Sequence, residues 1–287
     1  MIKFSIIIPL FNKEESVKNT IQSVLNQSYQ GFELIIVNDG STDNSLEVVT
    51  EIKDERIRIY NIPNGGVSNA RNYGISVSNY EYITFLDADD LWYENALEEF
   101  KYLIDNFTEA QVFFTSHTLN IKSINSRTRR YYIDNFFKQN SISYARTTTA
   151  ICCTGCVAIK SSCLNEICGF KTKLSHGEDI DLWERLSKRY KIAKSEVVTL
   201  LYRLDAENRS DKTNADLITK NIILIDKSKI IDKNEKLDWG RKYFFFLLQN
   251  FRDTKRLIFN IRILIKYFDL ISNFSWLIIK YKLIRNL

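Results

Sequence analysis

Short apolar runs alternate with helical patterns along the first hundred residues. Runs rich in β-branched residues and bounded by Asn, Asp, Gly or Pro are typical of buried strands. Such runs occupy residues 4–8, 34–37, 57–60 and 82–86. Between them, apolar residues at helical spacing predict helices over residues 17–25, over residues 45–49 with Ser45 as the cap, and over residues 70–77. This alternation predicts an α/β fold in which a mostly parallel, Rossmann-like sheet carries helices on both faces.

The pattern beyond residue 100 is weaker, and it still alternates. The expected elements are a helix to about residue 106, strands over residues 111–116, 153–159 and 196–204, a short helix from Ser161 or Ser162 to Gly169, and a helix over residues 177–190. From about Thr213 the pattern is helical to the end, which predicts a C-terminal helical extension.

Polar and acidic residues follow each of the first four apolar runs. The carboxyl ends of parallel strands meet at one edge of a sheet, where such folds bind their ligands. The opposite strand ends carry no comparable set. We therefore expect one site at this edge, formed by residues 9–15, 38–43, 61–66 and 87–90.

The composition indicates one large domain with an appendage. The chain has 287 residues, of which 45% are hydrophobic, and this excludes disordered, collagen-like and small disulfide-rich proteins. The first nine residues read as a strand and lack the features of a signal peptide. No segment is long and apolar enough to span a membrane, so we expect a cytoplasmic protein.

The basic charge is concentrated in the tail. Residues 241–287 hold ten Lys or Arg and two Asp, interleaved with aromatic and aliphatic side chains. Basic amphipathic helices of this kind lie on anionic lipid headgroups, which predicts peripheral contact with the inner face of the cell membrane. Packing against the rest of the chain and a homodimer interface are the alternatives. Nucleic acid is not an expected partner, because no reader motif accompanies the charge.

All five cysteines lie between Cys152 and Cys168, and an odd number argues against a disulfide framework. Cys153 and Cys156 have the spacing of a zinc knuckle or a redox pair. A second tight pair and a nearby His are absent from the sequence, so we predict that the cysteines are small buried hydrophobic residues.

The sequence Asp87-Ala88-Asp89 offers two carboxylates at the end of an apolar strand. A pair of this kind could share a hard divalent cation, Mn²⁺ or Mg²⁺, which would neutralise a diphosphate. The alternative is an acidic loop in which Asp90 caps a helix over residues 91–100.

Several segments together resemble family 2 glycosyltransferases, which are inverting, nucleotide-sugar-dependent enzymes of the GT-A fold. The resemblance is carried by residues 5–12, 35–43, 64–72 and 85–90, and it continues through residues 154–155, 169–170 and 177–183. It implies a catalytic domain over residues 1–210, with a nucleotide-sugar half over about 1–100 and an acceptor half over about 101–210. Residues 211–287 would form the separate basic, aromatic helical region.

The resemblance also implies roles for individual residues. Pro9, Phe11 and Asn12 would line the nucleotide pocket, although the family more often has Tyr at the position of Phe11. Asp39 would accept hydrogen bonds from the base, and Arg71 would donate to the base or the diphosphate. Taken singly, Asp39 is better interpreted as a turn residue, and Arg71 could equally be a surface arginine of a helix.

The resemblance assigns the acidic residues to metal binding and catalysis. Asp87 would hold the ribose and assist with the metal, Ala88 would lie beside the substrate, and Asp89 would be the direct metal ligand. Glu178 and Asp179 open a helix; Glu178 would contact substrate and Asp179 would be the catalytic base. The alternative is that these two acids only complement the helix dipole.

The function implied is transfer of a sugar, most simply from a UDP-sugar, to a hydroxyl of a glycan or lipid-linked acceptor in bacterial surface polysaccharide synthesis. The alternatives are a non-catalytic assembly subunit that keeps the fold and a sugar nucleotidyltransferase. Asp205 follows a Tyr-Arg-Leu sequence where many relatives have a His, and we leave it outside the expected site.

Overall fold

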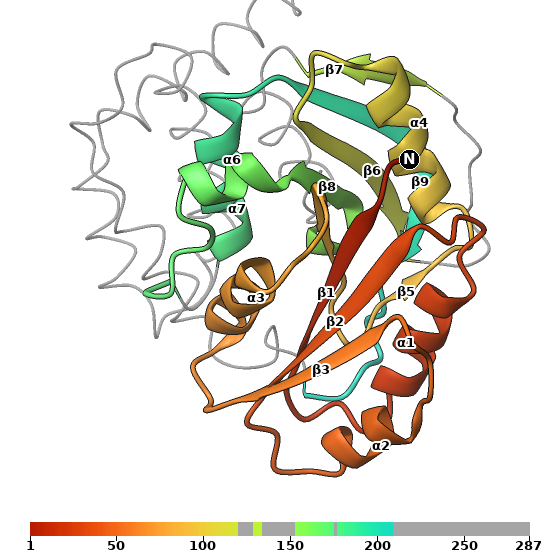
Figure 1. Cartoon of the computed structure of the whole chain (residues 1–287), viewed down its shortest axis with the longest axis vertical. Helices are drawn as coiled ribbons and strands as arrows, with labels where there is room; N and C mark the ends of the chain where they lie inside the picture. The colour runs from red at the N-terminus through yellow and green to blue at the C-terminus, as the bar shows by residue number, and fades with distance from the viewer. Residues whose placement is uncertain (120–128, 134–152, 175–176, 209–287) are drawn as a thin grey trace, which may run out of the picture. The chain divides into compact units, whose positions relative to one another are not determined.

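The computed structural model describes residues 1–119, 129–133, 153–174 and 177–208 (Figure 1). These residues belong to one compact unit of the chain. The predicted helical extension over residues 211–287 lies outside the described residues. In the part that is described, no helix is long and apolar enough to cross a membrane.

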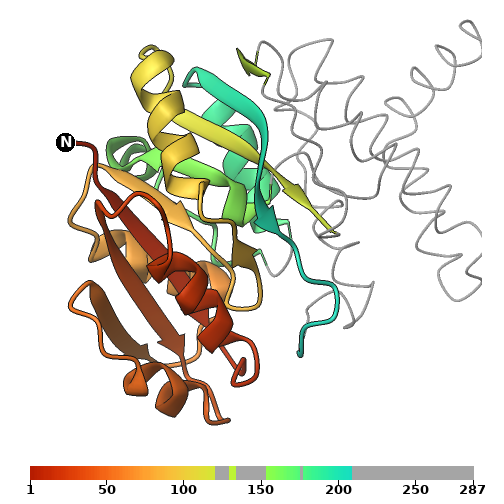
Figure 2. The ribbon, with the colours of Figure 1, turned by 90° about the vertical axis from the view of Figure 1, so that its right-hand side faces the viewer.

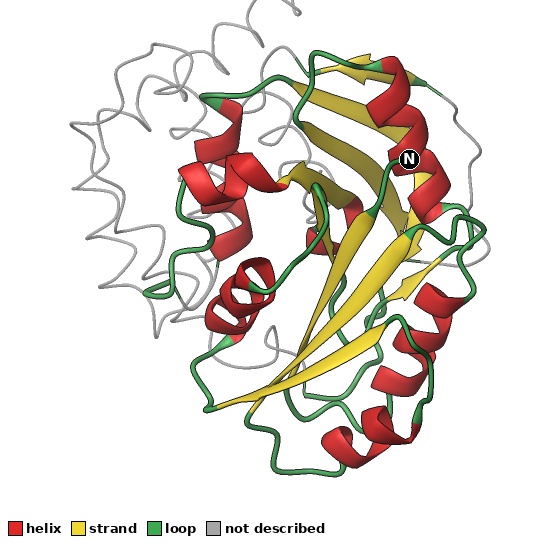
Figure 3. Cartoon of the chain, in the orientation of Figure 1, coloured by secondary structure: helices red, strands yellow, loops and turns green. Residues whose placement is uncertain are grey.

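Strands and helices alternate through the first half as the sequence predicts (Figure 3). The elements are β1 (Phe4–Leu10), α1 (Val17–Leu25), β2 (Phe32–Asp39), α2 (Ser45–Glu51), β3 (Ile57–Ile62), α3 (Val67–Ser76), β4 (Tyr82–Phe85), β5 (Leu91–Trp92), α4 (Ala96–Asn106), β6 (Val112–Thr118), β7 (Arg130–Tyr132), the 3-10 turn η2 (Thr154–Cys156), β8 (Val157–Lys160), α6 (Ser161–Glu166), α7 (Glu178–Ser187) and β9 (Ile192–Leu201).

The strands form one sheet in the order β3-β2-β1-β4-β8-β6-β9-β5, with β7 paired to β9. The first four strands in this order are parallel, as expected, and the red and orange strands run side by side in Figure 2. β8 runs antiparallel to both β4 and β6, while β6 and β9 are parallel. The sheet is therefore parallel in its first half and mixed in its second.

Helices cover both faces of the parallel strands, which confirms the predicted layers. Ile6 and Ile8 point into a core cluster that includes residues of α1 and α4. Ile7, with the opposite side-chain direction, meets α3 on the other face. A Cβ placed on Gly74 would lie 2.5 Å from Cγ2 of Ile7, so a glycine within α3 allows this close approach to β1.

Some predicted boundaries and caps need correction. Ser45 is the first residue of α2 rather than its cap, and its hydroxyl accepts a hydrogen bond from the Lys13 N–H at 2.7 Å. Asp90 caps no helix, because α4 begins at Ala96 with Asn95 at the N-cap position. The strand expected from Cys153 begins only at Val157, because the preceding three residues form a 3-10 turn.

Candidate active site

The Asp39 carboxylate lies at the end of β2 and is buried. Its two oxygens accept hydrogen bonds from the backbone N–H groups of Gly65 and Gly66 at 2.9 and 2.8 Å. These two amides lie directly before α3, so the carboxylate joins the end of β2 to the start of α3. Each carboxylate oxygen has two lone pairs, which leaves acceptor capacity for a further donor.

The loop after β1 is tied to the loop after β2. The Asn12 side chain accepts a hydrogen bond from the Thr42 N–H at 2.8 Å, and the Asn12 N–H donates to the Ser41 hydroxyl at 3.1 Å. Pro9 is buried within β1, whereas the Phe11 side chain is 44% exposed. The structure therefore presents the Phe11 ring at the edge of the sheet, beside a fixed polar loop.

Arg71 is a buried link between two parts of the candidate site. Its guanidinium lies 2.7 Å from Oδ1 of Asp87 and 2.9 Å from Oε1 of Glu178. Burial would lower the Arg71 pKa, but the two carboxylates raise it overall. Arg71 is therefore no surface arginine, and it holds the loop after β4 beside the first turn of α7.

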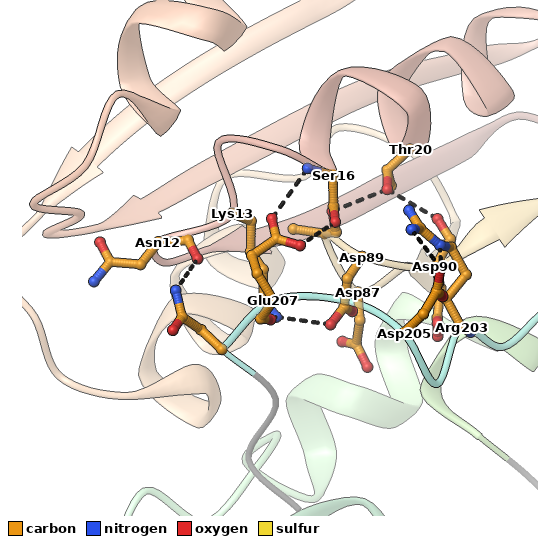
Figure 4. A network of polar contacts seen from close by, with 12 residues as sticks. Asn12, Lys13, Ser16, Thr20, Asp87, Asp89, Asp90, Arg203, Asp205 and Glu207 are labelled. Atoms are coloured by element: carbon orange, nitrogen blue, oxygen red, sulfur yellow. Dashed lines mark hydrogen bonds and ion pairs between the residues drawn. The ribbon is translucent and has the colours of Figure 1, made fainter. Parts of the chain in front are cut away.

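Asp89 faces a lysine that sequence reasoning did not assign. Nζ of Lys13 lies 2.7 Å from Oδ2 of Asp89, and both side chains are largely buried. The same ammonium donates to the carbonyl oxygen of Glu207, whose carboxylate accepts hydrogen bonds from Ser16 (Figure 4). The segment after β9 thus crosses the loop after β1 next to the acidic pair. Lys13 lies within the polar stretch that the sequence singled out, whereas no pattern in the sequence pointed to Glu207.

A threonine of α1 fixes the backbone of the acidic loop that follows β4. Oγ1 of Thr20 lies 2.9 Å from the carbonyl oxygens of Ala88 and Asp90. The Asp90 carboxylate is buried and accepts the Arg203 N–H at 3.0 Å, and burial followed by the charges of its acidic neighbours raises its pKa. Asp90 therefore anchors the segment after β9, while the exposed Asp205 pairs with Arg203.

Asp179 lies in the first turn of α7, which begins after Gly177 at a φ of 72°. Buried Leu182, Trp183 and Leu186 attach this helix to the core. The Asp179 carboxylate accepts the Ile180 N–H at 2.7 Å. Burial and then the neighbouring Glu178 charge raise the Asp179 pKa to about 7. A carboxylate whose pKa lies near the working pH is suited to accept a proton.

Comparison with known proteins shows which protein family the sequence matches. Residues 5–168 match the protein family described as Glycosyl transferase family 2. A chondroitin synthase from Pasteurella multocida (strain Pm70) is 28% identical over 271 residues, which are 90% of this chain and 27% of that protein. An uncharacterized glycosyltransferase from Rickettsia bellii (strain RML369-C) is 44% identical over 117 residues, which are 40% of this chain and 16% of that protein. The chain thus spans less than a third of either relative.

Among solved structures, S. aureus TarS 1-349 in complex with UDP-GlcNAc resembles this chain with a TM-score of 0.71. The two sequences are 18% identical, and the match covers 94% of this chain and 81% of TarS 1-349. At this level of identity the likeness shows a shared fold.

Proposed function

Because the chain belongs to glycosyl transferase family 2, we propose that it is an inverting enzyme that moves a sugar from a UDP-sugar to an acceptor hydroxyl. Membership of this family sets the nucleotidyltransferase alternative aside. The observation that carries the proposal is the double contact of Arg71 with Asp87 and Glu178. It holds the acidic loop after β4 beside the helix that bears Asp179, as a transfer between donor and acceptor requires.

The donor nucleotide would bind along the ends of β1 and β2. Asp39 would accept hydrogen bonds from the base with the lone pairs that its backbone contacts leave. The exposed Phe11 ring offers a flat apolar face for stacking, with Pro9 and Asn12 forming the adjacent wall. The UDP-GlcNAc held by the TarS structure supports the choice of a uridine nucleotide.

Asp87 and Asp89 would hold Mn²⁺ or Mg²⁺, with Ala88 between them against the substrate. Their carboxylates already receive cationic side chains, from Arg71 and Lys13, so this loop is suited to positive charge. Two carboxylates also match ions that keep other coordination positions for phosphate oxygens. Such an ion, when bound, stabilises the negative charge of the leaving diphosphate.

Asp179 would act as the catalytic base. Its carboxylate takes the proton of the acceptor hydroxyl while that oxygen attacks the anomeric carbon, on the face opposite the diphosphate. Attack from that face inverts the anomeric configuration. Glu178, held by Arg71, would fix the first turn of α7 and contact the substrate.

The acceptor is proposed to be a glycan or lipid-linked glycan of the bacterial surface, bound by the half of the catalytic domain over about residues 101–210. The chondroitin synthase among the relatives supports a glycan. Residues 211–287 would then meet anionic lipid or a second copy of the chain. Liposome flotation with and without residues 241–287 tests the lipid contact, and equal recovery of both forms in the soluble fraction would contradict it.

Calorimetric titration of UDP, GDP and CDP, in Mn²⁺ and then in EDTA, tests the donor site. We expect UDP to bind in Mn²⁺ and to lose most of its affinity in EDTA or in Asp89→Asn. Asp105→Asn, which changes an exposed carboxylate paired with Lys101, serves as the control and should bind normally. Absence of nucleotide binding under every condition would instead favour a non-catalytic assembly subunit.

A further inference from the structure

A second cluster of metal-binding side chains lies outside the proposed transfer machinery. His117 comes from β6, and Cys153 and Cys156 lie at the two ends of the turn that precedes β8. Their ligand atoms all lie within 4.8 Å of one another, and the two sulfur atoms are 3.1 Å apart. No pattern in the sequence indicated that His117 would lie near this pair. Of the described cysteines, Cys156 and Cys163 are buried as predicted, whereas Cys153 is half-buried and Cys168 is exposed.

The surrounding structure fixes the cluster in place. Trp92 Nε1 donates to the Gly155 carbonyl at 2.7 Å, and a Cβ on Gly155 would lie 3.0 Å from Leu200 Cδ1. The His117 ring packs at an angle against the Tyr202 ring, with centroids 6.1 Å apart. Cys156 is fully buried, whereas Cys153 and His117 are partly exposed. The three metal-binding side chains thus meet at one point, and the contacts around them fix the backbone that carries them.

The donor set matches zinc. Zn²⁺ binds thiolate and imidazole ligands in a tetrahedron, and its bond lengths place neighbouring ligand atoms about 3.5–3.8 Å apart. The observed separations, 3.1 Å between the two sulfur atoms and no more than 4.8 Å within the set, are close to these values. We propose that His117, Cys153 and Cys156 bind one Zn²⁺ ion, with the fourth position open to water on the exposed side of the cluster.

The imidazole of His117 favours a metal centre over a simple pair of thiols. Oxidation of Cys153 and Cys156 to a disulfide would use the two sulfurs alone, whereas a metal centre explains why His117 lies against both. Sulfur and imidazole ligands also separate this site from the oxygen-rich Asp87–Asp89 loop, which suits harder ions.

The zinc centre would have a structural effect on the catalytic domain. It would clamp η2 to β6, and the Trp92 bond connects η2 to β5, which follows the acidic loop. Because metal binding to a folded site stabilises that state, we expect chelation to lower the melting temperature.

Metal analysis of the full chain, purified without chelator or affinity histidines, tests the proposal. We expect about one equivalent of zinc in the native protein. Co²⁺ added to the apoprotein should give thiolate charge-transfer absorption and the visible bands of a tetrahedral ion. Cys153→Ser and His117→Gln should lose these bands, and circular dichroism checks that both variants are folded. Cys168→Ser, an exposed cysteine outside the cluster, is the matched control and should keep them.

Several results would overturn the proposal. One is native protein that takes up neither zinc nor cobalt; another is undiminished binding in both Cys153→Ser and His117→Gln. A metal-free peptide that is lighter by two hydrogen atoms and spans both cysteines would assign the pair to redox chemistry instead. Because Asp89→Asn leaves all three ligands in place, retained zinc in that variant would separate this site from the proposed donor metal.

Discussion

The two halves of the proposed site hold their carboxylates in different ways. In the first half, Asp39 accepts two backbone N–H groups, and Asp87 and Asp89 pair with Arg71 and Lys13. In the second half, Asp179 has an acidic neighbour, and its pKa is raised. The first arrangement surrounds the carboxylates with hydrogen-bond donors and cationic side chains, which suits binding. The second makes negative charge costly, which suits a group that must accept a proton.

The largest effect that tests this contrast is on turnover. Asp179→Asn removes the proton acceptor, so we expect the rate of transfer to fall about 10²–10⁴-fold. Release of UDP from a panel of UDP-sugars, with water in place of the acceptor, measures the rate. Asp181→Asn alters a carboxylate of the same helix turn that pairs with Arg185, and it should stay within a small factor of the native rate. Equal losses in the two variants would mean that the helix, and not the base, was affected.

The next effect is on stability, at the link between the halves. Arg71→Ala leaves Asp87 and Glu178 without their shared cation, so we expect the free energy of unfolding to fall by about 3 kcal/mol. Arg58→Ala breaks the ion pair between Arg58, whose side chain is 35% exposed, and Glu33. This change should lower the free energy of unfolding by about 1 kcal/mol. Urea denaturation compares the two variants. An equal, small cost for both would show that Arg71 does not join the halves.

An effect of similar size distinguishes the two halves by its dependence on pH. The folded chain keeps the Asp179 proton up to about pH 7, whereas the ordinary pKa in an unfolded chain is 3.8. Between these values the folded state binds more protons, so Asp179 lowers native stability as pH rises. Asp179→Asn should therefore gain stability over the native protein as pH rises through this interval. Urea denaturation across the interval measures the gain, and a difference that is the same at every pH would refute the raised pKa.

The smallest effect concerns Lys13, which competes with any cation for Asp89. Lys13→Gln removes this competitor, so we expect Mn²⁺ to bind up to about fivefold more tightly, which corresponds to about 1 kcal/mol. Calorimetric titration of Mn²⁺ measures the change, with Lys101→Gln as the exposed control. Weaker Mn²⁺ binding in Lys13→Gln would show that the lysine supports the metal rather than opposing it.

The first half of the site could be predicted from the sequence because its residues lie directly after predicted strands. Asp39 and Asp87 each follow directly on an apolar strand, and parallel strands bring their ends to one edge. The strand and helix order of this half was therefore predicted almost completely, and the contacts of Asp39 with Gly65 and Gly66 connect neighbouring strand ends.

The second half could be predicted less well because its contacts join segments that are far apart in the sequence. Arg71 meets Glu178 across 107 residues, and Lys13 meets Glu207 across 194. No spacing or periodicity encodes such a contact. The antiparallel entry of β8 has the same cause, since the direction of a strand depends on the path of the chain before it. His117 and Cys156 also meet only once β6 and η2 have packed.

The central claim is that one half of the site binds the donor and the other half carries the catalytic base. Comparing the pH dependence of the transfer rate with that of donor binding tests this claim most directly. UDP release from the UDP-sugar that turns over, and the calorimetric affinity for the same UDP-sugar, would be measured on one preparation from about pH 5 to 9. We predict that the rate rises through the Asp179 pKa near 7 and then levels, while donor affinity changes little. A flat rate profile, or an affinity that follows the rate, would contradict the account.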